Sequence, residues 1–404
     1  MQVNNINKES QPFVTISTQG RVANGKTSLI TKLTGINPMK FKKEAEKNMT
    51  IKLGYTNCKF YKCTKCPSPF CYQNTKICGQ CGLETELVLH VSFVDSPGHS
   101  DLQTTALSGA SNVDYSLLVV AANCQEDLET NEHYKANKIL GLTDNTFIIQ
   151  NKIDLVDKNK AYEHYDKLRE LYNIKYIIPV CAQFGLGLNY LIQFLVEKIG
   201  NPINEKFIEC IGKPLRVNII RSFDVNKVGT PVNNIVGAVV GGTIKTGTVK
   251  IGSMVKIVPG IITNGKSVPL KAKVLTLKTE NTNLDVAYPG GLIGFGLSLD
   301  PSLSKEDKLV GNFIVGIDDD SYSIFKKASM SFNKYNEEII VKSGEIYTLM
   351  MGSAKCNVKI TLVDNKKNEL TFETSTEMAG YSGDRVVMSK DNKIMLYGTI
   401  KKIF

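Results

Sequence analysis

Residues 20–27 have the types and spacing of a loop that holds phosphate groups. The segment reads Gly-Arg-Val-Ala-Asn-Gly-Lys-Thr and fits the pattern G-x-x-x-x-G-K-[ST]. The glycines let several backbone N–H groups point at one anion, while the Lys26 amine can reach the outer phosphates and the Thr27 hydroxyl can ligate Mg²⁺. A helix beginning at Ser28 would add its positive dipole end. The candidate nucleotide contacts here are Gly20, Val22, Ala23, Asn24, Gly25, Lys26, Thr27 and Ser28.

A second short motif, at residues 95–99, follows an apolar segment that reads as a strand at 87–94. We expect the Asp95 carboxylate to hold Mg²⁺ through a water molecule. The Gly98 N–H can sense the third phosphate, since glycine permits the peptide flip that makes or breaks this contact.

Two further motifs suit recognition of guanine. Asn-Lys-Ile-Asp at 151–154 follows a strand-like segment, and Asp154 can accept hydrogen bonds from the N1–H and N2–H₂ groups, a donor pair that adenine lacks. The Lys152 stem can lie over the purine, and Asn151 can brace the loop. In the last motif, Cys181-Ala182-Gln183, a backbone N–H near Ala182 would meet the guanine O6 atom.

The order of the four motifs is stronger evidence for nucleotide binding than any single motif. Asn-Lys-x-Asp alone would read as a turn that starts the next helix. Together, each at the carboxyl end of a predicted strand, they predict GTP and GDP binding with Mg²⁺.

Six of the ten cysteines lie between Cys58 and Cys81. Two C-x-x-C pairs, Cys63/Cys66 and Cys78/Cys81, have the spacing of two metal knuckles that complete a tetrahedral zinc site. Four thiolates leave no open position for chemistry, so this zinc would be structural. Cys58 or Cys71 could replace one ligand, and reduced free thiols in a loop are the alternative.

The bulk composition describes an ordinary folded chain. It has 404 residues, 42% hydrophobic and 22% charged, with a net charge of +10. No apolar run approaches the ~20 residues of a membrane span, and the polar N-terminus does not resemble a signal peptide, so we expect a cytoplasmic protein without a membrane partner. Half of the positive excess lies at 36–62, which suits either an RNA contact or a solvated face.

Residues 12–200 alternate strand and helix signals, including helix-like stretches near 127–140, 155–172 and 187–199. This pattern predicts an α/β P-loop GTPase domain with a doubly wound, mostly parallel sheet. From residue 213 onward, short β-branched runs such as 234–240 alternate with turn residues and predict two β-barrels. The expected domains are 1–205, with a zinc-knuckle insertion at 58–82, then 206–325 and 326–404.

The chain resembles a known family in several segments. The motifs above, in order with residues 48–55 and the cysteine insertion, are similar to the gamma subunit of translation initiation factor 2 of eukaryotes and archaea. Segments 221–227 and 289–294 extend the likeness, which covers residues 12 to about 320 and fades beyond. The resemblance implies a GTPase domain followed by two β-barrels, arranged as in elongation factor Tu.

The resemblance also implies a function. In the GTP state the factor would hold methionyl initiator tRNA and deliver it to the small ribosomal subunit, and hydrolysis would release it. Further partners would be the alpha and beta subunits, a GTPase-activating protein and a guanine nucleotide exchange factor. Thr50 matches a switch threonine that ligates Mg²⁺, and His99 matches the catalytic histidine that orients the attacking water. No arginine finger is identifiable, which predicts slow turnover without an activating partner.

Some residues depart from the family pattern. Arg21 and Asn24 stand where the family usually carries histidines, Ala23 where an acidic residue is frequent, and Cys181 where serine is usual. Two other functions remain as alternatives. One is an elongation-type or selenocysteine-type carrier of aminoacyl-tRNA, and the other is a GTP-binding scaffold without useful hydrolysis.

Overall fold

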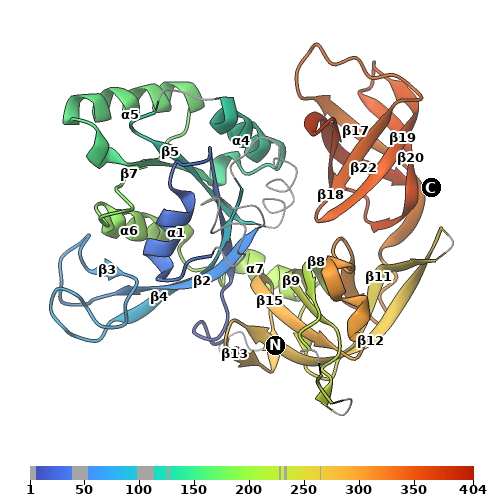
Figure 1. Cartoon of the computed structure of the whole chain (residues 1–404), viewed down its shortest axis with the longest axis horizontal. Coiled ribbons are helices and arrows are strands. Elements are labelled where there is room, and N and C mark those ends of the chain that lie inside the picture. Colours follow the sequence, from blue (N-terminus) through green and yellow to red (C-terminus); the bar gives the residue numbers. More distant parts are fainter. Residues whose placement is uncertain are drawn as a thin grey trace. The chain divides into compact units, whose positions relative to one another are not determined.

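The structure, a computed structural model, describes residues 6–38, 53–97, 113–124, 128–226, 229–231, 234–263 and 265–404 (Figure 1). The chain divides into two compact units, Met1–Glu205 and Lys206–Phe404. In the described part of the chain, no helix has the length and apolar character needed to cross a membrane.

A mixed β-sheet forms the centre of the N-terminal unit. Its strand order is β3-β2-β4-β1-β5-β6-β7. Strands β1, β4, β5, β6 and β7 run parallel, whereas β2 pairs antiparallel with β4 and β3 with β2. The strands are β1 (Val14–Gln19), β2 (Gly54–Lys62), β3 (Tyr72–Gln73), β4 (Glu86–Asp95), β5 (Tyr115–Ala121), β6 (Thr146–Asn151) and β7 (Ile177–Pro179).

Helices cover both faces of this sheet (Figure 1). The helices are α1 (Lys26–Thr34), α4 (Leu128–Ile139), α5 (Lys158–Tyr172) and α6 (Leu188–Ile199), and α7 (Glu205–Ile211) follows at the boundary of the units. Alternate residues of β5 face opposite sides, as a strand requires. Leu117 and Val119 pack with α1 and α6, whereas Leu118 and Val120 pack with α4 and α5. Because both faces are covered, the central strand β5 is apolar from Leu117 to Ala121.

The C-terminal unit begins with a β-barrel. Six strands form a ring in the order β11-β16-β8-β9-β15-β12, which closes because β11 also pairs with β12. They are β8 (Arg216–Phe223), β9 (Val239–Thr246), β11 (Met254–Thr263), β12 (Lys266–Thr279), β15 (Gly290–Leu297) and β16 (Phe313–Gly316). Short strands β10 (Val249–Lys250), β13 (Thr282–Leu284) and β14 (Val286–Ala287) flank the ring.

A second closed barrel follows in the same unit, in the order β17-β20-β19-β18-β21-β22. Its strands are β17 (Ser323–Lys334), β18 (Ile346–Met351), β19 (Ala354–Asp364), β20 (Glu369–Gly380), β21 (Arg385–Lys390) and β22 (Lys393–Ile403). Inward-facing residues such as Met330, Ile360 and Phe372 are fully buried in its core. The predicted fold class, an α/β GTPase domain followed by two barrels, is confirmed.

Candidate functional site

The phosphate loop connects β1 to α1, as the sequence predicts. Gly20 and Gly25 both have positive φ angles, 124° and 91°. A Cβ atom on Gly20 would overlap the Val119 carbonyl, and one on Gly25 would overlap the side-chain amide of Asn151. Glycine is therefore required twice, for backbone conformation and for close approach to β5 and to the loop after β6.

The first turn of α1 brings Lys26 and Thr27 to the loop. The Lys26 amine donates hydrogen bonds to the carbonyls of Gly20 at 2.7 Å and Arg21 at 2.9 Å, so its charge lies within the curve of the loop. The Thr27 hydroxyl donates to Asp95 Oδ2 at 2.7 Å. A hydroxyl and a carboxylate side by side are the hard oxygen groups that Mg²⁺ prefers, so these residues fit the ion.

Asp95 owes its position to the pairing of β1 with β4. Thr18 lies directly opposite Asp95 in the parallel register, and its hydroxyl donates to Asp95 Oδ1 at 2.9 Å. Asp95 is fully buried, so these two hydroxyl groups fix the orientation of its carboxylate. Thr18 was not among the residues predicted from the sequence, although a hydroxyl side chain near the end of the strand that leads into the phosphate loop is a signal that could have revealed it.

Asn151 joins three of the predicted motifs. Its side-chain amide donates to the Asn24 carbonyl at 2.9 Å, and its Oδ1 atom accepts from the Ala182 N–H at 3.0 Å. The Asn24 side chain in turn donates to the Val119 carbonyl of β5 at 2.9 Å. Asn24 and Asn151 are both buried, so this network fixes the phosphate loop relative to the loops predicted to read the base.

The remaining base-recognition residues lie on the same edge of the sheet. Lys152 has a positive φ of 59° and precedes the 3-10 turn Ile153–Leu155, which carries the exposed Asp154. The buried Cys181 thiol lies beside Asp154. Burial, and then hydrogen bonding to Asp154, raises the pKa of Cys181, so it stays a neutral donor. Gln183 is exposed next to the buried Ala182.

The other predicted residues are either partly exposed or not among the residues that the structure describes. Val22, Ala23 and Ser28 are at least partly exposed on the loop and the start of α1. Thr50, Gly98 and His99 fall outside the described residues, so their predicted roles stay predictions.

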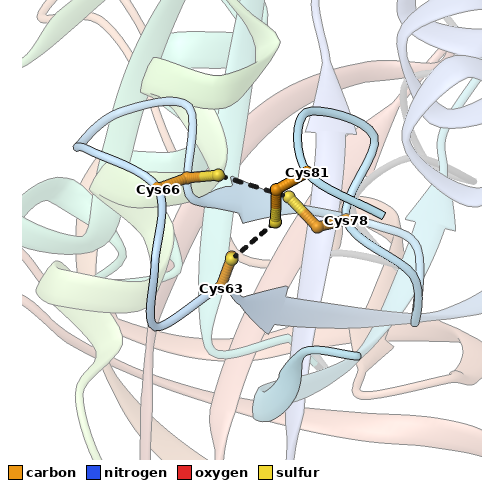
Figure 2. Close-up of side chains that lie close together, drawn as sticks. All are labelled: Cys63, Cys66, Cys78 and Cys81. Carbon is orange, nitrogen blue, oxygen red and sulfur yellow. Dashed lines mark hydrogen bonds between the residues drawn. The ribbon is translucent and has the colours of Figure 1, made fainter. Parts of the chain in front are cut away.

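The cysteine insertion brings four thiols together. Cys63 and Cys66 follow β2, and Cys78 and Cys81 lie in a turn after β3 (Figure 2). Their sulfur atoms all lie within 4.8 Å of one another, with Cys63–Cys81 and Cys66–Cys78 distances of 3.6 Å. Four sulfurs ~2.3 Å from a tetrahedral zinc would be about 3.8 Å apart, so the arrangement fits that ion.

Backbone hydrogen bonds favour the thiolate form of two of these thiols, Cys78 and Cys63, whereas burial raises the pKa of Cys66 to about 12. The backbone N–H groups of Cys81 and Gln80 lower the pKa of Cys78 to about 6, which favours its thiolate at neutral pH. The Lys65 N–H donates to the Cys63 sulfur at 3.4 Å and lowers the pKa of that thiol. N–H groups aimed at sulfur are typical of metal knuckles.

The two spare cysteines of this segment lie outside the cluster. The buried Cys58 thiol donates to the Leu33 carbonyl of α1 at 3.1 Å. Cys71 contributes a backbone carbonyl that accepts from the Cys63 N–H at 2.8 Å. The four converging thiols are those of the two C-x-x-C pairs.

Comparison with known proteins identifies the family. The pattern of the elongation factor Tu GTP binding domain matches residues 11–376. The gamma subunit of eukaryotic translation initiation factor 2 from Encephalitozoon cuniculi is 36% identical over 95% of this chain and 90% of its own length. The chain belongs to the gamma subunits of translation initiation factor 2. It is therefore a translational GTPase, as predicted.

Further relatives agree with this assignment. The Schizosaccharomyces pombe gamma subunit is 33% identical over 94% of this chain and 91% of its own length. The Methanocaldococcus jannaschii gamma subunit is 36% identical over 97% of this chain and 98% of its own length. Among solved structures, a bacterial selenocysteine-specific elongation factor has a TM-score of 0.74 over 96% of this chain and 58% of its own, with 22% identity. That likeness shows the shared fold. The gamma-subunit family resemblance is confirmed.

Proposed function

We propose that this chain binds methionyl initiator tRNA in its GTP-bound state, delivers it to the small ribosomal subunit and is released after hydrolysis. The supporting observation is the identity of 33–36% to eukaryotic gamma subunits across at least 94% of the chain, barrels included. The solved structures of selenocysteine-type elongation factors are only 17–22% identical to this chain in sequence. As in the family, the partners would be alpha and beta subunits, an activating protein and an exchange factor, in the cytoplasm.

The proposed nucleotide site uses the described contacts. Lys26 and the loop amides would lie against the phosphates, and Thr27, Thr50 and, through water, Asp95 would hold Mg²⁺. When bound, Mg²⁺ would supply charge neutralisation on the phosphate oxygens. Asp154 would select guanine, with Lys152 over the base and the Ala182 N–H facing O6. His99 would orient the attacking water, and Gly98 would contact the third phosphate.

We propose a structural zinc ion held by Cys63, Cys66, Cys78 and Cys81. The sulfur spacing and the N–H groups aimed at Cys63 and Cys78 support this choice. Bound zinc would supply a cross-link between two turns that otherwise share little regular structure. We also propose the domains 1–205, 206–325 and 326–404, with the last boundary moved to just before β17, because the whole of this strand belongs to the second barrel.

The test is filter binding of tRNA to the full chain. With a non-hydrolysable GTP analogue, methionyl initiator tRNA should be retained more tightly than methionyl elongator tRNA, and GDP should reduce its retention. Equal retention of the two tRNAs would favour a general carrier instead. A preference for selenocysteinyl tRNA would favour the selenocysteine-type carrier, and GTP binding without stimulated hydrolysis would favour a scaffold.

A further inference from the structure

The cysteine insertion packs directly against the elements that carry the nucleotide site. Three of the four predicted zinc ligands, Cys63, Cys66 and Cys78, lie in or against one apolar core. The same core contains Leu29, Ile30 and Leu33 of α1 and Leu191, Ile192 and Leu195 of α6. Packed side chains therefore connect the cluster to both helices.

One polar contact joins the insertion to α1. The Asn74 side chain donates to the carbonyls of Lys32 at 3.2 Å and Leu33 at 2.8 Å. These carbonyls belong to the last turn of α1, where they have no partner within the helix. The first turn of the same nine-residue helix carries Lys26 and Thr27. Asn74 thus stabilises the C-terminal end of α1, the helix that follows the phosphate loop.

A second contact joins the insertion to the base-recognition side. The Asn189 side chain, in the first turn of α6, donates to the Tyr72 carbonyl at 2.6 Å. The loop that contains Ala182 lies immediately before α6 and closes through a Cys181 N–H to Leu186 carbonyl bond at 2.9 Å. One turn further along, the Ser68 hydroxyl donates to Gln193 at 2.9 Å.

We propose that metal binding at the cysteine cluster and guanine-nucleotide binding are thermodynamically linked, with Asn74 and Asn189 as positioning residues that carry the linkage. The inference rests on the zinc and nucleotide sites of the proposed function. A bound zinc fixes the turns around Cys66 and Cys78 (Figure 2), and these flank the segment with Tyr72 and Asn74. That segment then holds α1 and α6 in the arrangement that the nucleotide requires.

The direct test measures release of a fluorescent GDP analogue from the full chain in Mg²⁺ buffer. Zinc content is measured separately, and zinc is removed with a chelator that spares Mg²⁺. Zinc removal should speed GDP release about fivefold or more. By reciprocity, bound GDP should tighten zinc affinity by the same factor as zinc tightens GDP affinity.

Variants separate linkage from simple support of the fold. The double variant Asn74→Ala/Asn189→Ala keeps all four thiols and should still bind one zinc. Its GDP release should already be fast with zinc present, and zinc removal should change it less than about twofold, since the linkage is lost. As a matched control, Asn145→Ala removes a side-chain bond to the Asp114 carbonyl. Both residues lie just before strands β5 and β6, at the edge of the sheet away from the nucleotide loops, and this variant should behave as wild type.

The outcomes are distinct. If the wild-type chain binds zinc and GDP but releases GDP at the same rate with and without zinc, the linkage is wrong while the GTPase assignment stands. If the double variant keeps the full response to zinc, the two asparagines do not carry it. A zinc-loaded chain that fails to bind guanine nucleotides would instead overturn the proposed nucleotide site.

Discussion

Arg216 at the start of β8 forms a two-point ion pair with Asp384, the residue before β21. The two nitrogen–oxygen distances are 2.9 and 3.0 Å, and both side chains are largely buried. The guanidinium also lies over the rings of Phe313 and Tyr381, 4.8 and 4.2 Å from their centroids. The two aromatic rings and the carboxylate all stabilise the positive charge. Because Arg216 and Phe313 belong to the first barrel and Tyr381 and Asp384 to the second, this cluster joins the two barrels.

We expect Arg216→Ala to lower the free energy of unfolding of the full chain by about 3 kcal/mol, since it leaves a buried carboxylate unpaired. Chemical denaturation is the measurement. Arg385→Ala, which removes the exposed neighbour next to Asp384 in sequence, should cost less than about 0.5 kcal/mol. Equal losses in the two variants would mean that the ion pair contributes nothing specific.

Asp154→Asn should change the base that the protein prefers. The substitution replaces an acceptor of two hydrogen bonds by an amide that meets the guanine N1–H and N2–H₂ groups with one acceptor only. We expect GTP affinity to fall on the order of 100-fold and affinity for xanthosine triphosphate, which has a carbonyl in place of the 2-amino group, to rise. Competition binding against a fluorescent GDP analogue measures both.

The control for this substitution is Asp157→Asn, three residues further on. Asp157 accepts the Lys160 N–H at the start of α5 and has no part in the proposed base contacts. Its substitution should leave the preference for guanine unchanged. A similar loss of GTP affinity in both variants would point to damage of the fold around α5.

The zinc ligands can be distinguished from their neighbours by single substitutions. Cys66→Ser and Cys78→Ser should abolish tight zinc binding and lower the melting temperature, because a knuckle loses one thiolate. Cys58→Ser and Cys71→Ser should each retain one zinc per chain, because neither thiol belongs to the cluster. Metal analysis of the purified variants decides this, and zinc loss on substitution of Cys58 or Cys71 would contradict the assignment.

His90 should make stability depend on pH. Burial lowers its pKa to about 4, although its Nδ1–H donates to the Lys8 carbonyl at 3.1 Å. The unfolded chain takes up this proton near pH 6.5, so it binds more protons than the folded chain between about pH 6.5 and 4. Stability is therefore lost as the pH falls through this window, by about 3 kcal/mol in total.

The measurement compares unfolding free energies of the wild type and His90→Gln at pH 7 and pH 4.5. The variant should lose less stability over this interval than the wild type, since it lacks the titrating ring. An imidazole titration near pH 6.5 in the folded protein, observed by NMR, would show that burial does not act on this group as described.

Much of the N-terminal unit could be predicted because its signals are local. The apolar segment 87–94 corresponds to β4, and the helix-like stretches correspond to α4, α5 and α6. The motif residues Asp95 and Asn151 end strands as expected. Their partners were harder to foresee, because Thr18 and Asn24 owe their contacts to strands that pair far along the sequence.

The barrels show where local patterns mislead. Residues 234–240 read as a strand, yet β9 begins only at Val239, and Ile235 and Val236 are 44% and 48% exposed. Gly237 lies against the Leu297 and Leu299 carbonyls, so the chain enters the barrel there and leaves the preceding residues without a strand partner. β-branched residues favour extended backbone, but pairing decides which of them join a sheet.

The two hydrogen bonds of Asn151 to segments far apart in the sequence have a consequence for biosynthesis. During translation the phosphate loop emerges early, whereas Ala182, whose N–H orients Asn151, is made more than a hundred residues later. A nascent chain that stops short of Ala182 thus lacks the contact that orients Asn151 toward the phosphate loop. We therefore expect guanine nucleotide to stabilise this polypeptide only after Ala182 has been made, so that earlier folding on the ribosome takes place without the ligand.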